Sequence, residues 1–140
     1  IFGERYFLET QRFPLLGRTC VLNQTLERLS ATTGARLCAT ADVHYPLPYQ
    51  NAMQRILHAA HRGGSVESVD ATWEYDILLT YPTSDAEIHQ DLVNTGLSES
   101  AATQAISSTR SIADKCNAEL PKAPRPHYII DTEKDWETWT

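Results

Sequence analysis

The sequence has few cysteines and no long apolar run. Its three cysteines (Cys20, Cys38 and Cys116) lie far apart and form no CxxC pair, so neither a zinc ribbon nor a disulfide framework is indicated. Reduced thiols fit a cytosolic protein, and we expect a cytoplasmic location. No apolar stretch approaches the ~20 residues that a membrane-spanning helix needs, and no basic-then-apolar signal segment opens the chain.

Basic residues are also scarce. The chain has 12 Lys and Arg against 18 Asp and Glu, which gives a net charge of −6. Because nucleic-acid affinity comes largely from cations that neutralise phosphates, this balance argues against a stand-alone DNA-binding module. The sequence also has no G-x-S-x-G elbow and no glycine-rich phosphate loop. We therefore expect any DNA contact to be local or made by a larger assembly.

The first part of the chain has an α/β pattern. Residues 6–9 form an aromatic and apolar run typical of a strand. A helix is predicted over about residues 19–33, with Leu22, Leu26 and Leu29 on its buried face and Gly34 as its left-handed cap. Residues 36–40 predict a short buried strand. The order strand, helix, strand favours parallel pairing.

Another helix is predicted to follow the two prolines Pro46 and Pro48. Its spacing predicts an apolar, buried face and an end at the two glycines that follow; the expected face is Met53, Ile56, Leu57 and Ala60. Residues 65–82 are poorly patterned, apart from the apolar run at 77–79. The expected domain organisation is an α/β portion at 1–82.

A helical portion is expected at 83–120. Ser84 and Glu87 form a capping box, and Gly96 and Ser98 separate this helix from a longer one. The long helix has an apolar stripe over its length: Ala102, Ala105, Ile106, Thr109, Ile112, Ala113 and Cys116. Residues 121–140 are expected to form a proline-rich linker and the start of a further element.

The sharpest chemical feature is the pair Asp42 and His44, directly after the second predicted strand. In an extended backbone, residues i and i+2 point to the same side. Carboxylate plus imidazole suits zinc, manganese or ferrous iron. The pattern D-x-H is common by chance, however, and the plainer alternative is a loop Asp that caps a turn, with the His packed beneath it. His58 and His61 lie three residues apart on a predicted helix and could add ligands, but two exposed histidines near the end of that helix are the favoured interpretation. His89 and His127 lack partners in the sequence.

Several segments in order resemble the alpha subunit of bacterial DNA polymerase III. The stretch RLCATADVHYP resembles that family's VATNDVHY segment, at the end of its polymerase-and-histidinol-phosphatase (PHP) domain, and RYFLETQR resembles the YLEL strand before it. AISSTRSIADKCNAEL resembles the A-x-x-N-T-x-x-I-A-x-x-C helix that leads toward the polymerase palm. SDAEI and LPKAPRP fall where the family has its EM helix and its LP-x-F segment. The agreement runs over roughly residues 4–126.

The resemblance implies a piece of a larger DNA-directed DNA polymerase, a nucleotidyltransferase of DNA replication. It implies part of a distorted α/β barrel whose strand ends hold a cluster of divalent metal ions (Zn, Mn or Fe). Asp42 and His44 match the last ligand pair, with Glu9 and Tyr45 as supporting residues, whereas Ala41 replaces the usual Asn. The family's early H-x-H motif and palm carboxylates have no counterpart here. We therefore expect no metal or weak metal binding in this segment alone, and no activity.

The expected partners are the rest of the alpha subunit and, through it, DNA. An alternative is a non-catalytic interaction module that docks a proofreading exonuclease or another replication protein. The acidic balance, Ala41 and the helical second half are compatible with it. A free-standing PHP-type phosphoesterase is disfavoured, because one ligand pair does not build a hydrolase with several metal ions.

Overall fold

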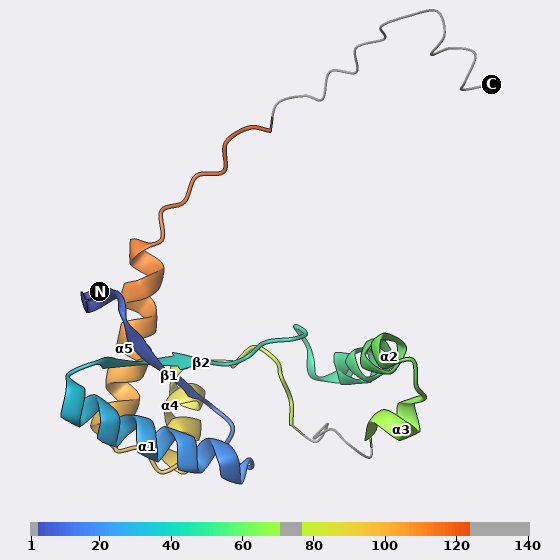
Figure 1. Cartoon of the computed structure of the whole chain (residues 1–140), viewed down its shortest axis with the longest axis horizontal. Coiled ribbons are helices and arrows are strands. Elements are labelled where there is room, and N and C mark those ends of the chain that lie inside the picture. Colours follow the sequence, from blue (N-terminus) through green and yellow to red (C-terminus); the bar gives the residue numbers. More distant parts are fainter. Residues whose placement is uncertain (1–2, 71–76, 124–140) are drawn as a thin grey trace, which may run out of the picture.

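A computed structural model describes residues 3–70 and 77–123 of the chain. Two strands and five helices follow one another in this order: β1 (Phe7–Gln11), α1 (Gly17–Thr33), β2 (Arg36–Thr40), α2 (Asn51–Arg62), α3 (Val66–Asp70), α4 (Asp85–Asn94) and α5 (Glu99–Lys115). Short 3-10 turns occupy Gly3–Arg5 and Pro48–Gln50. The expected α/β arrangement followed by helices is confirmed (Figure 1). His127 and the tail of the predicted linker lie outside the described residues.

The strands β1 and β2 pair in parallel, as predicted, with α1 as the crossover between them. In the register, Leu8 lies beside Leu37 and Thr10 beside Ala39. These four side chains are all buried and share one face of the two-stranded sheet. Helices α1, α4 and α5 contribute to the same apolar core: Leu8, Leu37, Ala39, Leu92, Leu97, Ala102 and Ala105, with Leu26, Ile88 and Ile106 packed against them. The helical segment and the strands therefore share a core.

The predicted buried face of α1 is only partly correct. Leu26 packs against the core, but Leu22 is 49% exposed and Leu29 is 43% exposed. The fully buried residues of this helix are polar, Thr19 and Asn23. The reason is that α1 lies against loop backbone as well as apolar side chains, and buried backbone groups need hydrogen-bond partners. Gly34 ends the helix in the left-handed conformation, as expected.

The predicted buried face of α2 is wrong. Met53 and Ile56 are each 59% exposed, Leu57 is 64% exposed, and Ala60 is exposed as well; the buried residue of this helix is Ala59. Helices α2 and α3 stand apart from the sheet and its covering helices (Figure 1). Arg55 pairs with Asp70 and so ties the two helices to each other. Hereafter we call residues 46–70 the α2–α3 lobe, and the remaining elements the main body.

Helices α4 and α5 begin as predicted. The Ser84 hydroxyl accepts a hydrogen bond from the Glu87 N–H, and the Ser98 hydroxyl caps α5 in the same way. The Glu87 carboxylate, however, reaches past Ser84 and accepts hydrogen bonds from the N–H and hydroxyl of Thr83. Gly96 turns the chain between the helices with a φ of 95°, a conformation that favours glycine.

The stripe of α5 is buried along its first half only. Ala102 and Ala105 are buried, Ile106 and Ile112 are half-buried, and Ala113 and Cys116 are exposed. Ser108 is buried although the predicted stripe did not include it. The exposed end of the helix extends beyond the sheet (Figure 1), so its last turns have no strand to cover. Among the described helices, none is long and apolar enough to cross a membrane.

Candidate metal-ligand pair after strand β2

Asp42 and His44 lie in the loop that leaves the carboxyl end of β2. Asp42 has a φ of 44°, and among the described residues it is the sole non-glycine with a positive φ. Aspartate tolerates this left-handed conformation better than most residues do. The side chains of Asp42 and His44 are 49% and 35% exposed. The loop therefore presents both groups to solvent, and His44 is not packed beneath an apolar layer.

The two side chains are close together. The His44 Nδ1 atom lies 2.8 Å from the Asp42 backbone oxygen and 3.7 Å from Asp42 Oδ1. Because a carbonyl oxygen only accepts hydrogen bonds, Nδ1 is the protonated nitrogen in this contact. The lone pair of the neutral ring is then on Nε2, which is the usual arrangement of a metal-binding histidine whose other nitrogen is held by a carbonyl group.

The pair supplies two donors of a metal site rather than a complete one. Zinc sites normally use three or four protein ligands. In the part of the chain that the structure describes, no three His, Cys, Asp or Glu side chains are grouped to hold a metal ion. Asp42 and His44 fit a metal ion as a partial ligand set, and the remaining ligands have to come from elsewhere. Their role as ligands stays a prediction.

Glu9 lies near the same end of the sheet, but its side chain contacts Thr40 of strand β2. Its Oε1 accepts a hydrogen bond of 2.6 Å from the Thr40 hydroxyl, and Thr40 ends β2 just before the loop. Burial, followed by the Glu9 carboxylate, raises the pKa of the neighbouring Cys38 thiol, so this thiol is not activated as a nucleophile. Glu9 therefore fastens the strand end from which the Asp42 loop departs.

Tyr45 is buried and fastens the loop from its other side. The Tyr45 hydroxyl accepts a 3.1 Å hydrogen bond from the Leu79 N–H. The Leu79 carbonyl in turn accepts from the N–H groups of His44 (2.9 Å) and Tyr45 (3.3 Å). These three hydrogen bonds hold residues 44–45 against residue 79, which follows the α2–α3 lobe in the chain. The sequence analysis assigned no role to Leu79. The apolar run at residues 77–79 was the one feature that distinguished this segment.

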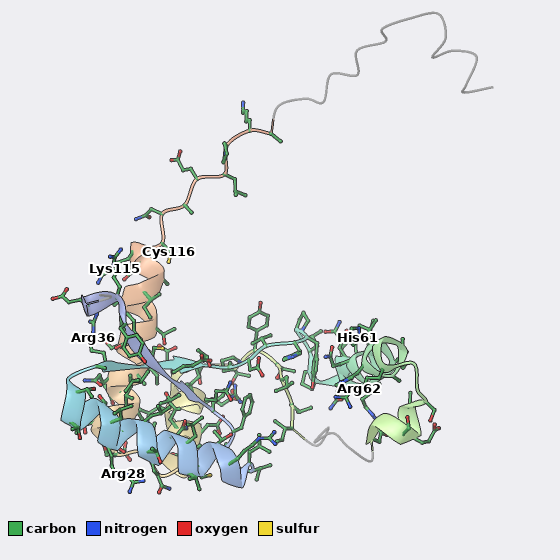
Figure 2. All side chains as sticks on the ribbon, in the orientation of Figure 1. Arg28, Arg36, His61, Arg62, Lys115 and Cys116 are labelled. Atoms are coloured by element: carbon green, nitrogen blue, oxygen red, sulfur yellow. The ribbon has the colours of Figure 1, made fainter. Side chains whose placement is uncertain are left out.

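The other histidines do not approach the pair. His61 is on the exposed end of α2 together with Arg62 (Figure 2), as expected. His58 on the same helix is half-buried and has a partner. The His89 Nε2 atom lies 3.2 Å from the Thr103 hydroxyl and 3.4 Å from a carboxylate oxygen of Glu99. These contacts join α4 to α5 within the main body.

A partly buried ion-pair cluster was missed by the sequence reasoning. Arg12, just after β1, lies 2.5 Å from Glu87 Oε1 and 2.9 Å from Asp91 Oδ2, both on α4. Hydrogen bonds from the Thr83 hydroxyl and N–H, together with Arg12, lower the pKa of Glu87 to about 2. Burial raises the pKa of Asp91, with the Glu87 charge adding to the effect and Arg12 opposing it. The cluster links the end of β1 to α4.

Comparison with known proteins gives one kind of match. No protein-family model matches the chain, and no solved structure matches it. The DNA polymerase III subunits alpha from two strains of Helicobacter pylori are each 24% identical to it over 122 residues. The chain resembles a DNA polymerase III subunit alpha. The match covers 86% of this chain but 9% of those proteins, so the chain spans about a tenth of their length.

Proposed function

We propose that the chain is part of a DNA polymerase III alpha-type subunit, at the end of its PHP domain. In this proposal Asp42 and His44 donate the last two ligands of a divalent metal site whose other ligands lie outside the chain. Helix α5 then leads from the α/β portion toward the polymerase palm. The observation that carries the proposal is the paired presentation of Asp42 and His44 directly after a parallel strand, with His44 Nε2 left available.

Two further features support the proposal. The similarity to the alpha subunits extends over 122 residues, which is far more than the Asp42 loop. The loop is also fastened on both sides, by Glu9 through Thr40 and by Leu79 through Tyr45. A ligand pair needs such support, because metal affinity depends on ligands that are held in orientation before the ion binds.

The test is the metal content of the polymerase subunit that contains this chain. We expect Asp42→Ala and His44→Ala each to lower bound divalent metal, measured by mass spectrometry of the purified subunit, by about 10-fold or more. His61→Ala is the matched control, since it removes an exposed histidine from the end of α2. Unchanged metal content in both ligand variants would contradict the assignment.

The isolated chain is expected to show neither primer extension nor 3′–5′ exonuclease turnover. Phosphoryl transfer relies on metal ions to neutralise developing charge, and the chain offers two candidate ligands. Metal-dependent turnover by the isolated chain that disappears in Asp42→Ala would overturn this expectation and favour a free-standing phosphoesterase.

A second candidate function is an interaction module that docks a proofreading exonuclease or another replication protein. The exposed apolar side chains Met53, Ile56 and Leu57 on the projecting α2 favour it. An Ile56→Asp substitution separates the two candidates. It should weaken docking of a proofreading exonuclease by the polymerase subunit while leaving the metal content unchanged.

A further inference from the structure

The segment of residues 79–83, which leads into α4, is fixed at both ends. At its first residue, the Leu79 carbonyl accepts a hydrogen bond of 2.9 Å from the His44 N–H. At its last residue, the Thr83 N–H and hydroxyl both donate to Glu87 Oε2 at 2.6 Å. In Figure 1 this segment passes the end of β2 on its way to α4. It therefore joins the backbone of the His44 loop to the first turn of α4.

The segment is short and is buried between its ends. It contains five residues, and Thr80 near its middle is buried. Because protein interiors are closely packed, a short buried segment transmits a displacement of one end to the other. The position of the His44 backbone therefore depends on the contact between Thr83 and Glu87 as well as on the loop after β2.

The Glu87 carboxylate also connects this segment to the end of β1. Its Oε1 atom lies 2.5 Å from the Arg12 guanidinium, one residue beyond β1, so Thr83 and Arg12 each use one of the two carboxylate oxygens. Arg12 and Leu78 border the same hollow of about 240 Å³, which places the chain just before the segment near the end of β1. Glu87 therefore joins the segment to both α4 and β1.

These contacts close a ring at the carboxyl end of the sheet. Because β1 and β2 are parallel, both leave the sheet at the same edge. The two strand ends are joined directly by a hydrogen bond between their side chains. They are joined a second time by the 79–83 segment, which runs from His44 to the Glu87–Arg12 pair. The His44 loop is therefore held on one side by β1 and on the other by α4.

We propose that Glu87 is a positioning residue for His44. It holds the segment whose Leu79 carbonyl binds the His44 N–H, and through that segment it orients the imidazole toward the metal ion. The inference rests on the proposed function, in which His44 is a metal ligand. Hydrogen-bonded neighbours that orient a ligand strengthen metal binding, and loss of such a neighbour lowers metal affinity by about 10–100-fold. Glu87 acts at a distance, through Thr83 and the rest of the segment.

The first test is the hydrogen exchange of single backbone amides in the polymerase subunit that contains this chain, measured by mass spectrometry. The reference is the Ala39 N–H, which donates to the Thr109 hydroxyl. Glu87→Ala should raise the ratio of the His44 exchange rate to the Ala39 exchange rate by about 10-fold, because the segment opens locally. A merely structural role would speed both amides alike. Asn23→Leu, which removes buried hydrogen bonds elsewhere in the main body, is the control and should change the ratio by less than about 3-fold.

A second pair of variants changes the other partner of the same contact. Thr83→Val removes the hydroxyl donor at nearly the same side-chain size and keeps the N–H, so the exchange ratio should rise by about 3-fold. Thr83→Ser keeps the hydroxyl and should restore the ratio of the unmodified subunit. Because Thr83 is exposed, both variants are expected to fold, and they decide the question if Glu87→Ala does not fold.

The second test is the metal content of the same subunit. Glu87→Ala should lower bound divalent metal by about 10-fold, whereas Asp85→Asn, an exposed acid in the same turn of α4, should leave it unchanged. An exchange ratio that does not rise in Glu87→Ala overturns the inference. Unchanged metal in Glu87→Ala also overturns it when His44→Ala lowers the metal. If His44→Ala itself leaves the metal unchanged, the proposed function is wrong and the orienting of a ligand fails with it, whereas a raised exchange ratio would still show that Glu87 holds the His44 backbone.

Discussion

The main body and the α2–α3 lobe contain helices with similar sequence patterns whose apolar faces differ in burial. Both α2 and α5 have an apolar stripe at helical spacing. In α5 the first half of that stripe is covered by β2 and α4, and Ala102 and Ala105 have no exposed surface. In α2 the stripe faces solvent, and the pair Arg55–Asp70 joins this helix to α3.

The difference shows what hydrophobic periodicity does and does not predict. It predicts that a segment is helical and which of its faces is apolar, because both follow from the geometry of the helix. It does not predict what covers that face, since the cover comes from distant parts of the chain or from another chain. An exposed apolar face on a well-formed helix is therefore an indication of a contact surface.

The largest expected effect comes from placing a charge in the shared core. Ile106→Asp puts a carboxylate beside the buried cluster of Leu37, Leu92 and Ala102. We expect it to cost about 3 kcal/mol or more of unfolding free energy, because an unpaired charge loses its hydration there. Thermal unfolding followed by circular dichroism should show a single transition for the unmodified chain and a strongly lowered midpoint for the variant.

Ile56→Asp on α2 is the matched control for that experiment. The chemical change is the same, but Ile56 is exposed, so the expected effect is within about 0.5 kcal/mol. An equal loss in both variants would mean that the α2 face is buried in solution. Two separate transitions in the unmodified chain would contradict a core shared by the strands and the helical segment.

The sequence predicted the fold well where signals are local. The strand at 36–40, the cap at Gly34 and the starts of α4 and α5 at Ser84 and Ser98 all depend on neighbouring residues. It failed where burial depends on distant partners, as in the face of α2. The buried Asn23 could not be predicted either, because nothing nearby indicates that Gln11 and Thr95 need its side chain.

A second prediction concerns that buried Asn23. Its side chain donates at 2.8 Å both to the Gln11 carbonyl and to the Thr95 hydroxyl, and its oxygen accepts from the Gln11 N–H. Asn23→Leu keeps the side-chain size but leaves these groups unpaired, at an expected cost of about 1–3 kcal/mol. Denaturant unfolding would measure it. Asn94→Leu is the control on an exposed residue and should cost less than about 0.5 kcal/mol; equal costs would contradict a specific role for Asn23.

The candidate site could be predicted in part. The D-x-H pattern after a strand indicated Asp42 and His44, and the structure places them together in one loop with a contact between them. The features that hold this loop were not predictable. Leu79 is 34 residues beyond Tyr45 in the chain, and the Glu9–Thr40 contact depends on strand register. Such supports join distant segments and leave no local pattern.

The smallest expected effect is the pH dependence of the ion-pair cluster that joins β1 to α4. The folded-state pKa of Glu87 is lowered to about 2 by Thr83 and Arg12. A lowered carboxyl pKa means that the stabilisation is present above the unfolded pKa, near ~4.5, and is lost as the pH falls toward 2. Because its side chain is 34% exposed, solvent screening limits the effect to about 1 kcal/mol.

The measurement is the difference in unfolding free energy between the unmodified chain and Glu87→Gln at a series of pH values. The difference should be about 1 kcal/mol at pH 7 and should shrink between pH 4.5 and pH 2. Asp91→Asn should show the opposite trend, because the raised pKa of Asp91 makes its charge unfavourable at neutral pH. Asp85→Asn, an exposed acid in the same first turn of α4, is the control. A Glu87→Gln difference that stays constant down to pH 2 would show that Glu87 acts through hydrogen bonds that the neutral amide also makes, and not through its charge.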